Sequence, residues 1–201
     1  MTRRINVRLL MLALSASLVG CMTKSSTEPA NTIRIASPEK IKSLDPIYAD
    51  DLYSGNEVSR TYETLLQYHY LKRPFVLEPQ LAASMPEISA DGKTFIFKLK
   101  QGVKFQDDPC FKATNGKGRE MTASDFIYSF QRLADPKNHS PGWWIFDGKI
   151  EGLNEWRDAA SKSGSAEYTA SITGLRAINP YTLQLKLKSP SAQILYALSM
   201  A

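Results

Sequence analysis

The stretch Ser89–Leu99, SADGKTFIFKL, says more about the fold than any other part of the sequence. Its Asp-Gly pair is flanked by Ile88 on one side and by regularly alternating apolar residues on the other. An Asp-Gly pair between two such runs is a strong signal for a β-hairpin, and the alternation implies one buried face. The buried face is expected to hold Phe95, Phe97 and Leu99, and the solvent face Lys98 and Lys100.

A second pair of strands is expected near the end of the chain. The turn Asn179-Pro180 separates a strand over 175–178 from a run in which Leu183, Leu185 and Leu187 alternate with other residues. Turn residues between two such runs favour adjacent strands.

Four amphipathic helices are indicated by apolar residues at helical spacing. The clearest begins at Thr122, where Thr122 and Asp125 form a capping box, and it ends at Asp135-Pro136. The others begin near Ser54, Leu153 and Ser189. The expected buried stripes are Val58, Tyr62, Leu65 and Leu66; Phe126, Ile127, Phe130, Leu133 and Ala134; Leu153, Trp156 and Ala160; and Ile194, Leu195 and Leu198.

The remaining segments complete a mixed pattern. Residues 33–35 (Ile-Arg-Ile) predict a short strand, and residues 106–121 predict an irregular loop. Strands and helices alternate without an internal repeat, which is typical of an α/β protein, here with two lobes.

The first 20 residues predict a secretion signal. A basic start, MTRRINVR, precedes an apolar run, LLMLALSASLV, of about half the length that a membrane-spanning helix needs. The run ends in Leu18-Val19-Gly20-Cys21, which resembles the bacterial lipobox. The resemblance implies that residues 1–20 are removed and that acyl chains on Cys21 anchor the protein to a membrane. An uncleaved anchor helix, or a chance cysteine in a plain secretory signal, is the alternative.

The rest of the chain is nearly balanced in charge. Residues 21–32 are small and polar, and predict a flexible tether. Without the three arginines of the signal, 22 Lys and Arg stand against 20 Asp and Glu. This balance does not favour a nucleic-acid partner.

Few residues are available for metal or redox chemistry. The sequence has two cysteines, Cys21 and Cys110, and two isolated histidines, His69 and His139. This composition predicts no zinc cluster, no disulfide framework and no cofactor. Cys110 is either a buried thiol or the partner of a cysteine beyond residue 201. The turn at 115–118, NGKG, lacks the spacing of a phosphate loop.

A series of short motifs follows in order along the chain. They are LDP at 44–46, YETLL at 62–66, EPQLA at 78–82, SADGKTFIF at 89–97, GVKF at 102–105, TASDFIYSF at 122–130 and YTL at 181–183. Each is weak alone, but their order and spacing resemble the family 5 extracellular solute-binding proteins. These are the capture subunits of oligopeptide, dipeptide and nickel ABC importers. The resemblance runs from about Ile33 to the last residue.

The resemblance implies a class II periplasmic-binding-protein fold, in which two lobes close over the ligand like a hinge. It places residues 33–65 and 176–201 in lobe I, and residues 66–175 in a subdomain inserted into that lobe. Family members are considerably longer, so the fold is expected to be incomplete, with the second lobe missing.

Two neighbouring acids are candidate ligand contacts. Asp50 and Asp51 follow the LDP turn, and the resemblance implies that an acidic side chain near here pairs with the free amine of a peptide. The alternative is a solvated loop or a helix-capping pair, because acidic side chains are mostly exposed.

The aromatic residues Trp143, Trp144 and Phe146 are further candidates. By resemblance, this stretch reaches the ligand cleft, where flat aromatic walls suit peptides of varied sequence. Packing between the subdomain and the lobe is the competing interpretation. Tyr48 and Tyr53 allow the same two interpretations.

These expectations predict a substrate-binding lipoprotein of the cell envelope. It would capture oligopeptides and deliver them to ABC permease subunits, and it needs no catalytic residues. A surface receptor or adhesin without transport is one alternative. A secreted hydrolase is the other, and it is disfavoured because the sequence has no GxSxG and only two isolated histidines.

Overall fold

The computed structural model describes residues 29, 31–36 and 38–200, and the chain forms two compact units, Met1–Pro38 and Glu39–Ala201. In the first unit, the described residues contain neither helix nor strand, and Ile33 and Ile35 are exposed. The strand predicted over 33–35 is therefore wrong, because no strand among the described residues pairs with this segment. The predicted signal, Cys21 and most of the predicted tether lie outside the described residues.

The second unit is built on a four-stranded antiparallel sheet with the strand order β3-β4-β6-β5. The hairpin predicted around Asp91-Gly92 is confirmed, since β3 and β4 pair and Gly92 has a φ of +66°. The second predicted pair is also confirmed, as β5 and β6. The strands are β3 (Glu87–Ile88), β4 (Thr94–Lys98), β5 (Leu175–Asn179) and β6 (Thr182–Lys186).

The core lies on one face of this sheet. Phe95 of β4 lies opposite Leu185 of β6, and Phe97 lies opposite Leu183. All four side chains are almost completely buried, as the alternating sequence predicts. The lysines expected on the other face, Lys98 and Lys100, are exposed.

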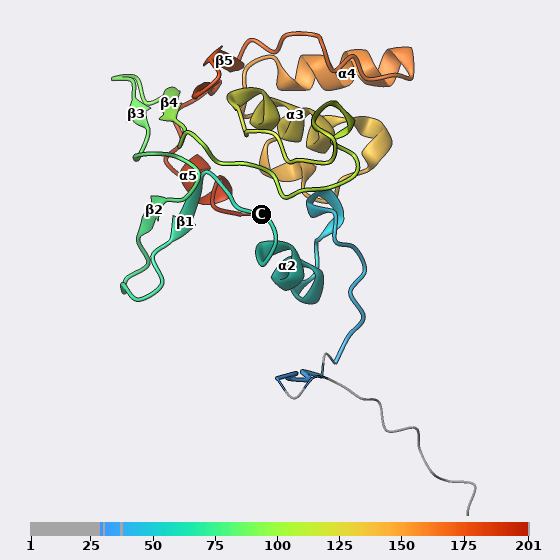
Figure 1. Ribbon diagram of the computed structural model, residues 1–201. Helices are drawn as coiled ribbons and strands as arrows, with labels where there is room; N and C mark the ends of the chain where they lie inside the picture. The colour runs from blue at the N-terminus through green and yellow to red at the C-terminus, as the bar shows by residue number, and fades with distance from the viewer. Residues whose placement is uncertain (1–28, 30, 37, 201) are drawn as a thin grey trace, which may run out of the picture. The chain divides into compact units, whose positions relative to one another are not determined.

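One helix covers the buried face, and a second helix packs on the first. Helix α3 (Ala123–Ala134) packs on β5 and β6, and α4 (Leu153–Ser163) packs on α3 (Figure 1). The predicted capping box of α3 is present: the Asp125 carboxylate accepts a hydrogen bond from the Thr122 amide at 2.7 Å. The Asp-Pro stop is also confirmed, since Asp135 is the C-cap residue.

A smaller hairpin stands apart from the main sheet. Strands β1 (Leu66–Tyr68) and β2 (Leu77–Pro79) form a separate two-stranded sheet, and the loop between them points away from the body of the unit (Figure 1).

The remaining two helices are shorter than predicted. Helix α2 (Leu52–Ser59) ends before Leu65 and Leu66, and α5 (Ile194–Ala197) is a single turn. Leu66 instead begins β1 and donates its amide hydrogen bond to the Leu198 carbonyl. Pairing with distant segments has thus overridden the helical spacing at 62–66. No helix within the described residues is long and apolar enough to cross a membrane.

Candidate functional site

An open cavity of about 430 Å³ lies where segments distant in the sequence meet. Its lining comes from helix α3 and from residues 46–47, 49–50, 62–65, 140–142, 144–146, 197–198 and 200. Most of its lining is apolar, with Asp50 and Glu63 as the charged residues, and the lining contains no lysine, arginine or histidine. A concave, largely apolar surface with a few polar groups is the usual form of a small-ligand site.

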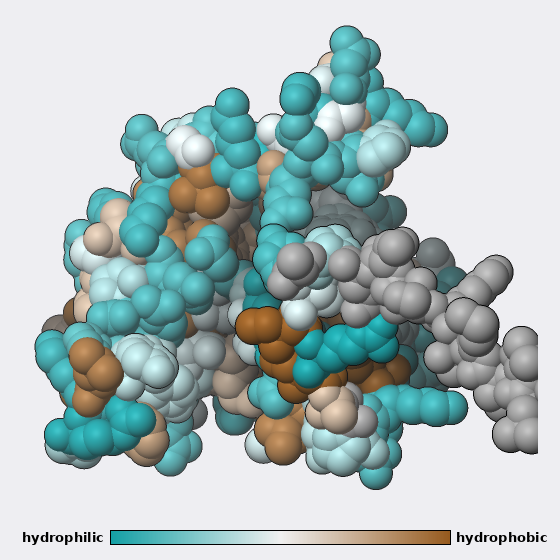
Figure 2. Space-filling view, turned by 60° about the horizontal axis from the view of Figure 1, so that its bottom comes forward, coloured by the Kyte–Doolittle hydropathy of each residue, from teal (hydrophilic) through white to brown (hydrophobic). Residues whose placement is uncertain are grey.

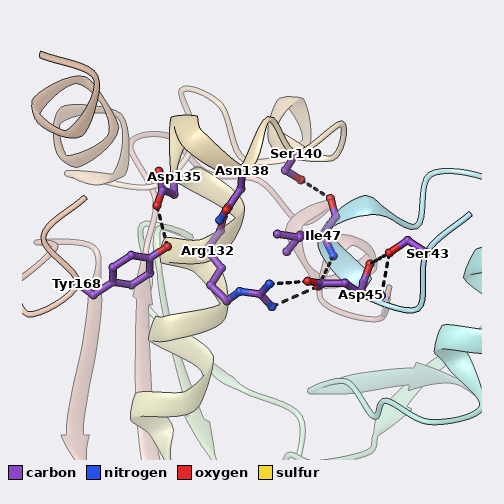
Figure 3. Close-up of polar contacts among 8 residues, drawn as sticks. All are labelled: Ser43, Asp45, Ile47, Arg132, Asp135, Asn138, Ser140 and Tyr168. Atoms are coloured by element: carbon purple, nitrogen blue, oxygen red, sulfur yellow. Dashed lines mark hydrogen bonds and ion pairs between the residues drawn. The ribbon is translucent and has the colours of Figure 1, made fainter. Parts of the chain in front are cut away.

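One wall is fixed to α3 by an ion pair. The 3-10 turn η1 (Pro46–Tyr48) follows Asp45, whose carboxylate accepts hydrogen bonds from both terminal nitrogens of Arg132, at 3.2 and 2.6 Å (Figure 3). The same carboxylate accepts from the Ile47 amide at 3.3 Å. The hydrogen bond with Asp45 also raises the pKa of Arg132. The aspartate of the LDP motif therefore positions the wall.

A second set of hydrogen bonds fixes the adjoining wall, to which residues 140–142 and 144–146 contribute. The Ser140 hydroxyl donates to the Ile47 carbonyl at 2.8 Å, and the Asn138 amide group donates to the Arg132 carbonyl at 2.7 Å (Figure 3). Nearby, the buried Asp135 accepts from the Tyr168 hydroxyl at 2.9 Å. Burial, together with this hydrogen bond, raises the pKa of Tyr168 to about 12. The two walls are therefore held in place before any ligand binds.

The structure separates the two candidate acids. Asp50 is exposed and lines the cavity. Asp51 is the N-cap of α2, and its Oδ1 accepts from the amides of Tyr53 and Ser54 at 3.1 and 3.0 Å. The hydrogen bond from the Ser54 amide is the main reason that the pKa of Asp51 is lowered. Asp51 thus has the geometry of a helix cap, and neither Asp51 nor Tyr53 lines the cavity.

The aromatic candidates also divide. Phe146 lines the cavity but is buried, with its ring edge-on to Phe130 at 5.1 Å between centroids. Trp144 lines the cavity and is 71% exposed. Trp143 lies outside the lining, under the guanidinium of Arg157 at 4.9 Å. The cavity therefore brings together Asp50, Trp144 and Phe146 from the predicted set.

Sequence reasoning missed part of the lining. Tyr62 and Glu63 line the cavity. The sequence instead predicts that this segment is helical, with Tyr62 on the buried face of the helix. Met200 lines the cavity beyond α5 and had no signal in the sequence pattern. No feature of the sequence pattern indicated Glu63.

The other candidate chemistries gain no support. Cys110 is exposed, so of its two alternatives the buried thiol is wrong. Within the described residues, no three side chains of the metal-binding types come together. A shallower groove of about 570 Å³ lies beside α4, but its Glu155 is already paired with Lys188 at 3.0 Å.

Comparisons with known proteins identify the family of the chain. The sequence model described as bacterial extracellular solute-binding proteins, family 5 (middle), matches residues 76–201. The periplasmic murein peptide-binding protein MppA of Escherichia coli is 28% identical over 178 residues, which cover 75% of this chain and 30% of that protein. The oligopeptide-binding protein OppA of Bacillus subtilis is 27% identical, over 84% of this chain and 27% of that protein.

Solved structures agree with the sequence comparison. The peptide-bound OppA of Listeria monocytogenes matches with a TM-score of 0.61 and 28% identity, over 80% of this chain and 27% of that one. An oligopeptide transporter's substrate-binding domain from Bacillus anthracis matches with a TM-score of 0.62 and 25% identity, over 82% of this chain and 28% of that one. The chain thus spans less than a third of the length of these relatives. Its α/β structure corresponds to part of their fold, and the chain belongs to the family 5 bacterial extracellular solute-binding proteins.

Proposed function

We propose that this chain forms part of a receptor that captures peptides and delivers them to an ABC permease. The observation that carries the proposal is the open cavity with its exposed Trp144, preorganised walls and rim carboxylates, in a chain of the solute-binding family. The names of relatives as peptide-binding proteins support the same ligand class.

The cavity suggests how a peptide is held. Trp144 offers a flat apolar surface that accepts different side chains, and Asp50 offers a carboxylate to a free amine. Neither interaction breaks or makes a covalent bond, so we propose binding without catalysis. In a two-lobed binding protein, the opening of such a cavity would face the other lobe, which would cover the ligand.

The proposal includes a division of the chain. Residues 33–65 and 176–201 would belong to lobe I, with residues 66–175 inserted between them. Strand β6, from the last piece, pairs with β4 of the insert. This shared sheet supports one continuous lobe in which the insert is firmly attached.

We also propose that Cys21 is lipidated and that the protein is anchored in the cell envelope. The LVGC sequence after a short apolar run supports this modification. Radioactive palmitate should label the wild-type chain and leave the Cys21→Ser variant unlabelled. Equal labelling of both would overturn the proposed anchor.

A titration tests the ligand class. We expect the 201-residue chain to bind tripeptides to pentapeptides weakly, with a Kd of about 1 mM, because a ligand in this open cavity keeps one side in contact with water. Acetylation of the peptide amine should weaken binding further, and Asp50→Asn should remove that difference. Asp158→Asn, an exposed acid on α4, is the matched control.

Two results would contradict the proposal. Equal affinity for free and acetylated peptides would exclude the proposed role of Asp50. A complete lack of saturable peptide binding at several times the expected Kd, about 1 mM, would exclude the cavity as a peptide site. Micromolar affinity would show that the chain alone encloses the ligand.

A further inference from the structure

The loop of the β1–β2 hairpin exposes large apolar side chains that the core does not use. Tyr70 is 87% exposed, Leu71 is 76% exposed and Phe75 is 63% exposed. These three residues lie within eight positions, His69–Val76, which we call the hairpin tip. Single exposed apolar residues are common, but a cluster of this kind on one projecting loop indicates a binding surface.

The charged residues of the hairpin tip are all basic. Lys72 and Arg73 lie between the exposed apolar residues, and residues 69–77 contain no aspartate or glutamate. The nearest acid along the chain, Glu78, is engaged on β2: it accepts from the Gln67 amide group at 2.9 Å and lies 4.0 Å from His69. The tip therefore presents positive charge together with aromatic and aliphatic surface.

The tip has a defined shape. The Arg73 guanidinium donates to the carbonyls of Tyr70 and Lys72, at 3.2 and 2.8 Å, and lies 4.4 Å from the centre of the Phe75 ring. At the base, Tyr68 contacts Phe75 edge-on and stacks on Tyr196 at 6.2 Å. These contacts define a loop conformation in which Tyr70, Leu71 and Phe75 are exposed. Figure 2 brings the bottom of the view in Figure 1 forward, and hydrophobic surface lies next to hydrophilic surface on that face.

We propose that the hairpin tip docks on an anionic lipid surface. Tyrosine and other aromatic residues favour the boundary between headgroups and acyl chains, and lysine and arginine are attracted to anionic headgroups. The combination of Tyr70, Leu71 and Phe75 with Lys72 meets both requirements on one loop. A protein partner fits less well, because the centres of protein interfaces are depleted in lysine. Docking would hold the unit at a fixed orientation to the membrane.

A fluorescent label at the tip tests the proposal locally. The full chain carries Cys21→Ser and Cys110→Ser, so that no acyl chain and no other thiol contributes, and an environment-sensitive dye is attached at Leu71→Cys. The matched control carries the dye at Ile178→Cys, an exposed apolar position on β5. Each protein is mixed with phosphatidylcholine vesicles that contain or lack phosphatidylglycerol, and brominated lipid is used as the quencher.

We expect a blue shift and quenching at position 71 with the anionic vesicles, and no response at position 178. Adding Lys72→Glu should weaken the apparent partition at position 71 at least fivefold, since one basic residue near such a surface contributes about that factor. Lys162→Glu, at the end of α4, should leave it unchanged.

Three results would overturn the proposal. The first is no response of the dye at position 71. The second is an equal response of the dyes at positions 71 and 178, and the third is an equal response at position 71 to vesicles with and without phosphatidylglycerol. Sedimentation without lipid provides a further check. If the chain is a dimer that Lys72→Glu dissociates, the hairpin tip binds a second copy of the chain and not a lipid surface.

Discussion

The two hairpins of this chain have similar local structure and opposite environments. In the β3–β4 hairpin, Phe95 and Phe97 are fully buried because β6 and α3 complete the sheet around them. In the β1–β2 hairpin, Phe75 is 63% exposed, and no further strand from the described part of the chain joins the pair. An alternating or apolar sequence thus indicates a strand. Whether the side chains of that strand are buried in the core depends on the elements that pack against it.

This difference separates structural residues from residues that are free for binding. Buried aromatics contribute to the free energy of unfolding, whereas exposed aromatics on fixed loops contribute little to it and remain available to a ligand or surface. The same division recurs in the cavity between Phe146 and Trp144, and beside it between Asp45, which is paired with Arg132, and Asp50. Each of these pairs can be tested by matched substitutions.

The largest contrast is expected between the hairpins themselves. Phe97→Ala should lower the free energy of unfolding by about 3–5 kcal/mol, because it leaves a cavity in the core of the sheet. Phe75→Ala should change it by about 0.5 kcal/mol or less, as is usual for surface positions. Urea denaturation of both variants measures the difference. Equal losses would show that the hairpin tip is part of the core.

The cavity should repeat the contrast with a smaller amplitude. Phe146→Ala removes the contact with Phe130 and should destabilise the chain by about 3 kcal/mol, near the low end for buried phenylalanine because the site adjoins open space. Trp144→Ala should leave stability within about 0.5 kcal/mol and weaken peptide binding. The idea fails if thermal unfolding shows Trp144→Ala to be as destabilising as Phe146→Ala.

The sequence was a good guide where local and global requirements coincide. The hairpin at Asp91-Gly92, the capping box at Thr122 and the alternating leucines at 183–187 all appear as expected. In each, the turn or cap residues and the apolar period specify the same structure, so no distant partner is needed to choose between alternatives.

Sequence reasoning failed where distant contacts decide. The apolar residues at 62–66 have helical spacing, but the predicted helix does not continue to Leu66. Leu66 begins a strand that pairs with residues 77–79, and its amide donates a hydrogen bond to the Leu198 carbonyl. For the cavity, the family resemblance made Asp50 and Trp144 candidate ligand contacts but did not distinguish them from Asp51 and Trp143, which lie outside the lining. That distinction depends on which side chains are occupied by capping and by Arg157, which only the fold determines.

The acids near the LDP turn provide a third contrast. Asp45→Ala removes the hydrogen bonds to Arg132 and Ile47, and it should cost about 1–2 kcal/mol for a partly exposed charge-assisted pair. Asp50→Ala removes no hydrogen bond that positions a wall, and its effect should stay within about 0.5 kcal/mol. Chemical denaturation compares them. A loss at Asp50 similar to that at Asp45 would mean that both acids are structural.

The smallest effect concerns the cap of α3 and appears as a pH dependence. Partial burial of Asp125 acts to raise its pKa, but the hydrogen bonds from Arg119 and from the Thr122 amide outweigh it, so the pKa lies below the ordinary value of about 3.9. A lowered carboxyl pKa stabilises the folded chain above the unfolded pKa, and this contribution is lost as the pH falls through the folded pKa. Thermal unfolding between pH 6 and pH 3, as a rough range around these values, should therefore show a smaller acid-induced decrease for Asp125→Asn than for the wild type. Asp158→Asn, on the exposed side of α4, is the control, and an acid response of Asp125→Asn identical to that of the wild type would show that the cap does not titrate with folding.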